Sequence, residues 1–118
     1  MKKSSTSILV FGVYLIGMGA GLIFMPDFVL GTLGFPPATD VWVRVVGALA
    51  LLLAFYYISA ARTGTTAFAQ WTVPGRVGVF LAFVGFVVAG LVGPMMIALG
   101  LVDLLGAIWT WSALHSES

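Results

Sequence analysis

Hydrophobic positions fall into four long blocks along this chain, each bounded by charged residues or prolines. The blocks cover residues 8–25, 41–61, 77–93 and 95–113. An α-helix rises about 1.5 Å per residue, so about 20 apolar residues cross the roughly 30 Å of hydrocarbon in a bilayer. Each block is close to that length. The pattern therefore predicts an all-α protein, a bundle of four transmembrane helices forming one integral membrane domain over residues 1–118.

Two of the connections are expected to lie on the membrane interface. Residues 26–40 include Phe28 and Phe35 and are too apolar for a free aqueous loop, so a short interfacial segment is expected there. Pro36 and Pro37 prevent a helix from continuing into the second block. The second helix is therefore expected to begin only after these prolines.

The second connection, over residues 63–75, mixes Phe68 and Trp71 with threonine and glutamine, which predicts another short interfacial segment. Pro74, followed by Gly75, is expected to separate this segment from the third helix. The third connection is expected to be a tight turn at residues 93–94.

The composition indicates that these helices lie in a bilayer. Of all residues, 61% are hydrophobic and only 8% are charged, far from the balance of a soluble domain. The net charge is +1, and no basic run extends beyond Lys2 and Lys3, which excludes a nucleic-acid partner. Cysteine is absent, which excludes disulfides, thiolate metal ligands and cysteine nucleophiles.

Basic residues near the helix ends predict the orientation. Of the five, only Arg44 falls on one side, and the other side carries Lys2, Lys3, Arg62 and Arg76. The positive-inside bias therefore predicts an N-in/C-in topology, with both termini cytoplasmic. Tryptophan settles at headgroup depth, and the expected interface anchors are Trp42, Arg76, Trp109 and Trp111.

A cleaved signal peptide is the alternative for the N-terminal block, because Lys2 and Lys3 precede an apolar stretch rich in small residues. That stretch is somewhat long for a signal peptide, and no convincing A-x-A site follows it before Pro26. Cleavage would leave three helices in the same orientation.

Small residues predict which helix faces meet, because helices in lipid associate through close packing and not through the hydrophobic effect. They recur every three or four residues in the third block and form a GxxxG spacing in the first. In the fourth block, a small residue shares a helix face with Asp103. The predicted packing positions are Gly17, Gly21, Gly78, Ala82, Gly85, Ala89 and Gly100.

Asp103 is the most informative single residue, because it lies near the middle of an apolar block. An ionised aspartate at the centre of a membrane helix is unfavourable by about 2.5–3.5 kcal/mol, so it is expected to have a partner or a function. Arg44 is the predicted partner, since an arginine can bury its stem and direct its head group elsewhere. Alternatively, Arg44 reaches Asp40 or Asp27, and Asp103 is protonated.

Catalytic chemistry is not expected from this set of side chains. The chain has one histidine and four carboxylates, and neither a nucleophile–base arrangement nor a zinc site can be assembled from them. His115 is expected to be an ordinary interfacial residue. The sequence predicts no enzyme, no cofactor and no metal.

Four short segments resemble a recurring pattern of small four-helix bacterial membrane proteins. They are Gly34-Phe35-Pro36-Pro37, Trp42-Val43-Arg44, Val73-Pro74-Gly75-Arg76 and Asp103-Leu104-Leu105-Gly106-Ala107-Ile108-Trp109-Thr110. From about Gly21 onward the chain is similar to DoxX-like proteins. The resemblance implies a bundle in the bacterial inner membrane and supplies no catalytic residues.

Two functions stay open at this level. The first is a non-catalytic protein that acts by association, either with itself or as an accessory subunit of a larger membrane assembly, because almost no soluble surface is predicted. The second is binding or transport of a small lipophilic or ionic ligand through Asp103. The expected partners are the lipid bilayer and other membrane subunits or copies of this chain.

Overall fold

The computed structural model describes residues 1–117 as an all-helical chain with five helices and, within those residues, no strand. The helices are α1 (Lys3–Phe24), α2 (Pro26–Thr32), α3 (Trp42–Thr63), α4 (Thr66–Val88) and α5 (Met95–Glu117). The four long helices, α1, α3, α4 and α5, are long and apolar enough to cross a membrane. The predicted all-α class and the number of long apolar helices are confirmed.

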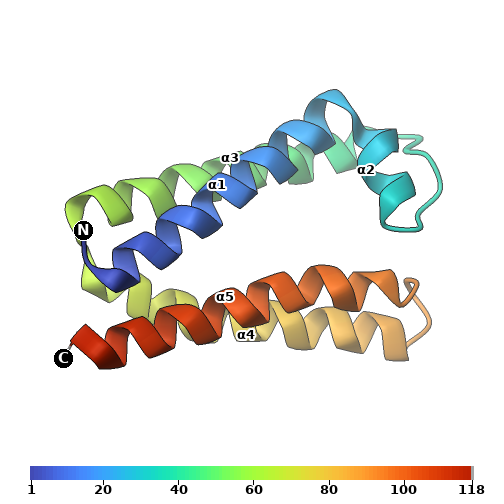
Figure 1. Cartoon of the computed structure of the whole chain (residues 1–118). Helices are drawn as coiled ribbons and strands as arrows, with labels where there is room; N and C mark the ends of the chain where they lie inside the picture. The colour runs from blue at the N-terminus through green and yellow to red at the C-terminus, as the bar shows by residue number, and fades with distance from the viewer. Residues whose placement is uncertain (118) are drawn as a thin grey trace.

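The long helices form two antiparallel pairs, α1 with α3 and α4 with α5 (Figure 1). The pairs meet mainly through α1 and α5, and both chain termini lie at the same end of the molecule (Figure 1). The short helix α2 lies at the opposite end, within the connection where the sequence predicts an interfacial segment.

Helix α4 differs most from the sequence prediction. It begins at Thr66 and continues through Pro74. The prediction of a second interfacial segment over residues 63–75 is therefore wrong. Proline removes one backbone hydrogen bond from a helix, but membrane helices tolerate it where neighbouring groups compensate. The buried residues Ala69, Thr72 and Arg76 recur along one face of this first half of the helix. That face packs into the protein, which favours the continuous helix.

The end of α4 also differs from the prediction. The helix ends at Val88 and not at Gly93, and residues 89–94 form the connection to α5. Gly90 adopts a φ of 78°, in the left-handed region that favours glycine. The amide of Leu91 donates to the carbonyl of Phe86 and closes the helix end.

Polar side chains hold the two pairs together at the end that carries the termini. Glu117 accepts hydrogen bonds from the amide and the hydroxyl of Ser4, at 2.6 and 2.9 Å, at the start of α1. Lys2 donates to the carbonyl of Gly64 and to the hydroxyl of Thr66, between α3 and α4. The hydroxyls of Ser7 and Thr110 bond at 2.7 Å, directly between α1 and α5. These bonds tie all four long helices together at one end.

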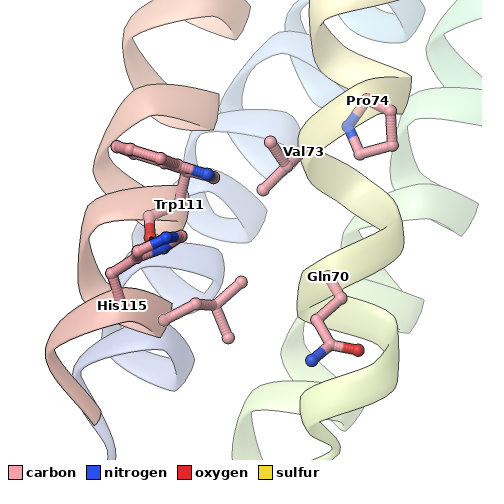
Figure 2. A pocket seen from close by; sticks show the side chains of 6 residues that line it. Gln70, Val73, Pro74, Trp111 and His115 are labelled. Atoms are coloured by element: carbon pink, nitrogen blue, oxygen red, sulfur yellow. Dashed lines mark hydrogen bonds between the residues drawn. The ribbon is translucent and has the colours of Figure 1, made fainter. Parts of the chain in front are cut away.

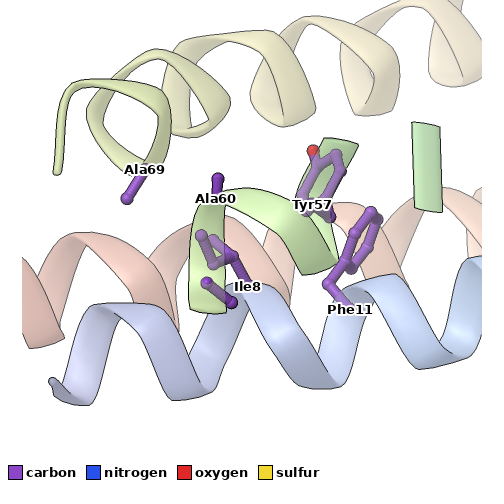
Figure 3. Packing of buried hydrophobic residues seen from close by; sticks show 6 residues of the cluster. Ile8, Phe11, Tyr57, Ala60 and Ala69 are labelled. Atoms are coloured by element: carbon purple, nitrogen blue, oxygen red, sulfur yellow. The ribbon is translucent and has the colours of Figure 1, made fainter. Parts of the chain in front are cut away.

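The apolar core lies close to these bonds. It is formed by six buried residues from α1, α3 and α4, and Figure 3 shows five of them with labels. The aromatic rings of Phe11 and Tyr57 pack with centroids 5.1 Å apart. The core consists of Ile8, Phe11, Tyr57, Ala60, Ala61 and Ala69.

The closest helix contact is between α1 and α3, and it uses glycines other than those predicted. A Cβ added to Gly19 would lie 2.7 Å from the carbonyl oxygen of Gly47, and one added to Gly47 would lie 2.8 Å from that of Gly19. By contrast, a Cβ at Gly17 would meet nothing within 4 Å, and one at Gly21 would meet Val29 of α2. The predicted Gly17–Gly21 contact between long helices is therefore wrong within this chain.

Candidate functional site: a cavity with a buried arginine and an aspartate

Arg76 lies inside the protein and not at the membrane interface that the sequence predicts for it. Its side chain is only 2% exposed. Nη2 donates to the hydroxyl of Thr110 at 2.6 Å and to that of Thr72 at 3.0 Å, and Nε donates to the carbonyl of Thr72. The guanidinium therefore links α4 to α5 and is held in one orientation.

Two aromatic rings and one glycine surround the rest of this guanidinium. Its Cζ lies 4.8 Å from the centre of the Phe11 ring and 5.8 Å from that of Tyr57, within the range of cation–π attraction. A Cβ at Gly106 would lie 2.9 Å from Nη1, so a larger residue there would displace the group. Nη1 is buried and has no hydrogen-bond partner. An unsatisfied buried donor of this kind calls for an explanation.

Asp103 lies on α5 and is the nearest source of negative charge. It interacts electrostatically with Arg76, and with Tyr14 and Tyr57. Among the described residues it makes no direct ion pair and accepts no hydrogen bond from another side chain. Asp103 and Arg76 thus have opposite formal charges and lie near each other. Nη1 of Arg76 and the carboxyl group of Asp103 both have hydrogen-bonding capacity that no other side chain among the described residues uses.

A cavity of about 630 Å³ lies between the two helix pairs and includes this charge pair in its lining. All five helices contribute to its wall, with Leu15, Met18, Ala50 and Phe83 among the apolar residues. The polar side chains of the lining are Tyr14, Tyr57, Arg76 and Asp103.

The wall is therefore divided between two kinds of surface. Among the lining residues, the four polar ones lie toward the joined end of the molecule, near the middle of α1, α4 and α5 and in the C-terminal part of α3. Toward α2, the lining consists of residues such as Leu22, Leu30 and Met96. The cavity consequently has a polar end and an apolar end.

Comparison with family models, with curated proteins and with solved structures finds no match to this chain. The resemblance to DoxX-like proteins stays a prediction.

The predicted partner of Asp103 is wrong in this structure. Arg44 is exposed and donates to the carbonyl of Ile23, which lies on the neighbouring helix α1. Arg76 occupies the position near Asp103 instead. Pro74 and Gly75 predict the end of an interfacial segment, which would place Arg76 at an aqueous boundary. The spacing of Ala69, Thr72 and Arg76 on one helix face was the signal that could have found it.

The other predicted positions fall into two groups. Gly100 is buried and packs against the rings of Phe80 and Phe83, at the contact between α5 and α4. The small residues Gly78, Ala82 and Gly85 of α4, and Ala89 just after it, are exposed. A Cβ added at Gly78 or Gly85 would meet nothing within 4 Å among the described residues. The tryptophans Trp42, Trp109 and Trp111 are exposed and face outward from the bundle.

A second depression lies outside the bundle core, between α4 and α5, and is lined by Gln70, Val73, Pro74, Trp111, Leu114 and His115. Figure 2 shows the ring of Trp111 beside that of His115, and their centroids are 4.2 Å apart. No group of three or more His, Asp or Glu residues in the described chain is placed to hold a metal ion. The cavity with Arg76 and Asp103 is therefore the stronger candidate site.

Proposed function

We propose that this protein is a non-catalytic, multi-pass membrane protein that binds a small lipophilic molecule in the cavity between its two helix pairs. The observation that carries the proposal is the combination of a cavity of about 630 Å³ with an apolar wall and a few polar groups at one end. Ligand sites in proteins have this composition, and their volumes are typically about 300–1,000 Å³.

The proposed setting is the bacterial inner membrane, with both termini cytoplasmic. Lys2 and Lys3 lie at the start of α1 and Arg62 in the last turn of α3, which is the end that carries the termini, whereas Arg44 lies in the first turn of α3. The positive-inside bias supports this orientation even after Arg76 is removed from the comparison. Termini at the same end of the molecule agree with an even number of membrane crossings.

The orientation can be measured because the chain contains no cysteine. A membrane-impermeant maleimide should label a Thr39→Cys variant in intact spheroplasts and a Ser116→Cys variant only after the membrane is opened. The reverse labelling pattern would contradict the proposed orientation.

The cavity can be tested by filling it. Ala50 lines the cavity, whereas Ala48, two positions earlier on α3, is exposed and is not part of the lining. We expect Ala50→Phe to reduce the amount of small lipophilic molecule that copurifies in native mass spectrometry by about tenfold or more, because the added ring occupies the site. Ala48→Phe, the matched control, should retain the molecule. Equal retention by both variants would contradict binding in this cavity.

Association with another copy or with a larger assembly is the second candidate function. It is favoured by the exposed small residues of α4, since such residues let membrane helices approach closely. A Gly85→Leu variant in lipid nanodiscs is expected to dissociate any such assembly, and Val88→Leu on the same helix serves as the control. An unchanged assembly state in Gly85→Leu would contradict the role of this face.

A further inference from the structure

The polar end of the cavity contains charges of both signs held apart. Arg76 is fixed by Thr72 and Thr110 and makes no direct ion pair with Asp103 within the described residues. A ligand with a permanent positive charge is attracted by Asp103 but repelled by Arg76, and the opposite holds for a permanent anion. The arrangement therefore favours a ligand without net charge.

The same end offers unused hydrogen-bonding groups of both kinds. Asp103 presents carboxylate oxygens that accept no hydrogen bond from another side chain in the described chain. The hydroxyls of Tyr14 and Tyr57 also line the cavity and make no hydrogen bond among the described residues. Tyr57 is more than nine-tenths buried, at 7% exposed. A bound group that forms hydrogen bonds with these atoms would be held there, because each such bond contributes to binding.

We propose that the ligand is an uncharged lipophilic alcohol, whose hydroxyl donates to Asp103 and accepts from Tyr14 or Tyr57. A hydroxyl is both donor and acceptor, which matches this pairing of groups. The positive charge of Arg76 lies near the Asp103 carboxyl group, and the alkyl part of the ligand occupies the apolar end. This inference rests on the proposed function, because it names the head group of the molecule bound in the same cavity.

Four photoactivatable probes with the same dodecyl chain separate the possible head groups. They carry a hydroxyl, a carboxylate, an ammonium group or no head group, and are added to the full chain in phosphatidylcholine nanodiscs. We expect the alcohol to label cavity peptides at a concentration about tenfold lower than the other three, because a hydrogen bond to a charged group contributes at least that factor. Peptide mapping by mass spectrometry identifies where each probe has reacted.

Substitution of the polar end tests the assigned contacts. Asp103→Asn should weaken labelling by the alcohol and strengthen labelling by the carboxylate probe, because it removes the negative charge. Asp27→Asn, which changes an exposed carboxylate, is the control and should behave like the unmodified protein. If Asp103→Asn does not fold, the Tyr14→Phe/Tyr57→Phe double variant removes only two hydroxyls and should also weaken labelling by the alcohol.

The possible outcomes distinguish this inference from the function on which it rests. Cavity labelling that is equal for the alcohol and the alkane would overturn the head-group assignment and leave the cavity as a lipophilic site. A preference for the ammonium or the carboxylate probe would also overturn it, in favour of a cation or an anion. If no probe labels the cavity, the proposed function itself fails.

Discussion

Replacing Arg76 with methionine is expected to lower the free energy of unfolding by about 1.5–3 kcal/mol, the range for hydrogen bonds to a charged group. The variant loses the hydrogen bonds to Thr72 and Thr110 and leaves Asp103 without a compensating charge. Methionine keeps a flexible apolar side chain of similar length beside Phe11. The measurement is unfolding in mixed micelles with increasing dodecyl sulfate.

A double-mutant cycle identifies the true partner of Asp103. Arg76→Met combined with Asp103→Leu should lose less stability than the sum of the two single changes, with a coupling in the range of about 0.5–3 kcal/mol. Arg44→Met, combined with the same Asp103→Leu change, should give additive effects, because Arg44 bonds to the carbonyl of Ile23. Coupling to Arg44 and additivity with Arg76 would restore the pairing predicted from sequence and contradict the structure.

Gly19→Ala is expected to lower the free energy of unfolding by about 1–3 kcal/mol, the usual effect of forcing extra atoms into a packed interface. The new methyl group would lie 2.7 Å from the backbone oxygen of Gly47 and 2.8 Å from Cγ of Leu51. A backbone oxygen within a helix cannot move away as a side-chain terminus can. The pair α1–α3 must therefore separate to accommodate the change, and Gly47→Ala should have an effect of the same size.

Gly17→Ala provides the matched control on the same helix. A Cβ at Gly17 meets nothing within 4 Å, so this change should leave the stability unchanged or raise it slightly through the better helix propensity of alanine. Thermal unfolding followed by circular dichroism compares the two variants under the same conditions. A larger loss in Gly17→Ala than in Gly19→Ala would favour the GxxxG contact predicted from sequence.

The difference between these glycines depends on the rotation of α1, which the sequence pattern does not specify. The first block contains a series of glycines, and the GxxxG spacing of Gly17 and Gly21 identified a small-residue region without fixing its rotation. Only the position of α3 determines which glycine faces it. Gly47, which completes the contact, lies in a different block and carries no local signal of its own.

Arg76 illustrates the same point for the candidate site. Asp103 lines the cavity, and its apolar surroundings in the sequence are enough to mark it as unusual. Its electrostatic partner depended on whether the chain around Pro74 was helical. Because α4 continues through that proline, Arg76 lies on the buried face of the helix, and the expected interfacial segment does not form.

The sequence by itself determined that the chain is helical and that four of its helices are long and apolar enough to cross a membrane. These properties follow from the length and composition of continuous blocks, which act over neighbouring residues. The pairing of α1 with α3, the use of Gly19 and Gly47, and the meeting of Arg76 with Asp103 were decided only by the tertiary structure. They depend on how helices far apart in sequence are rotated and placed against one another, and that is a property of packing rather than of any single block.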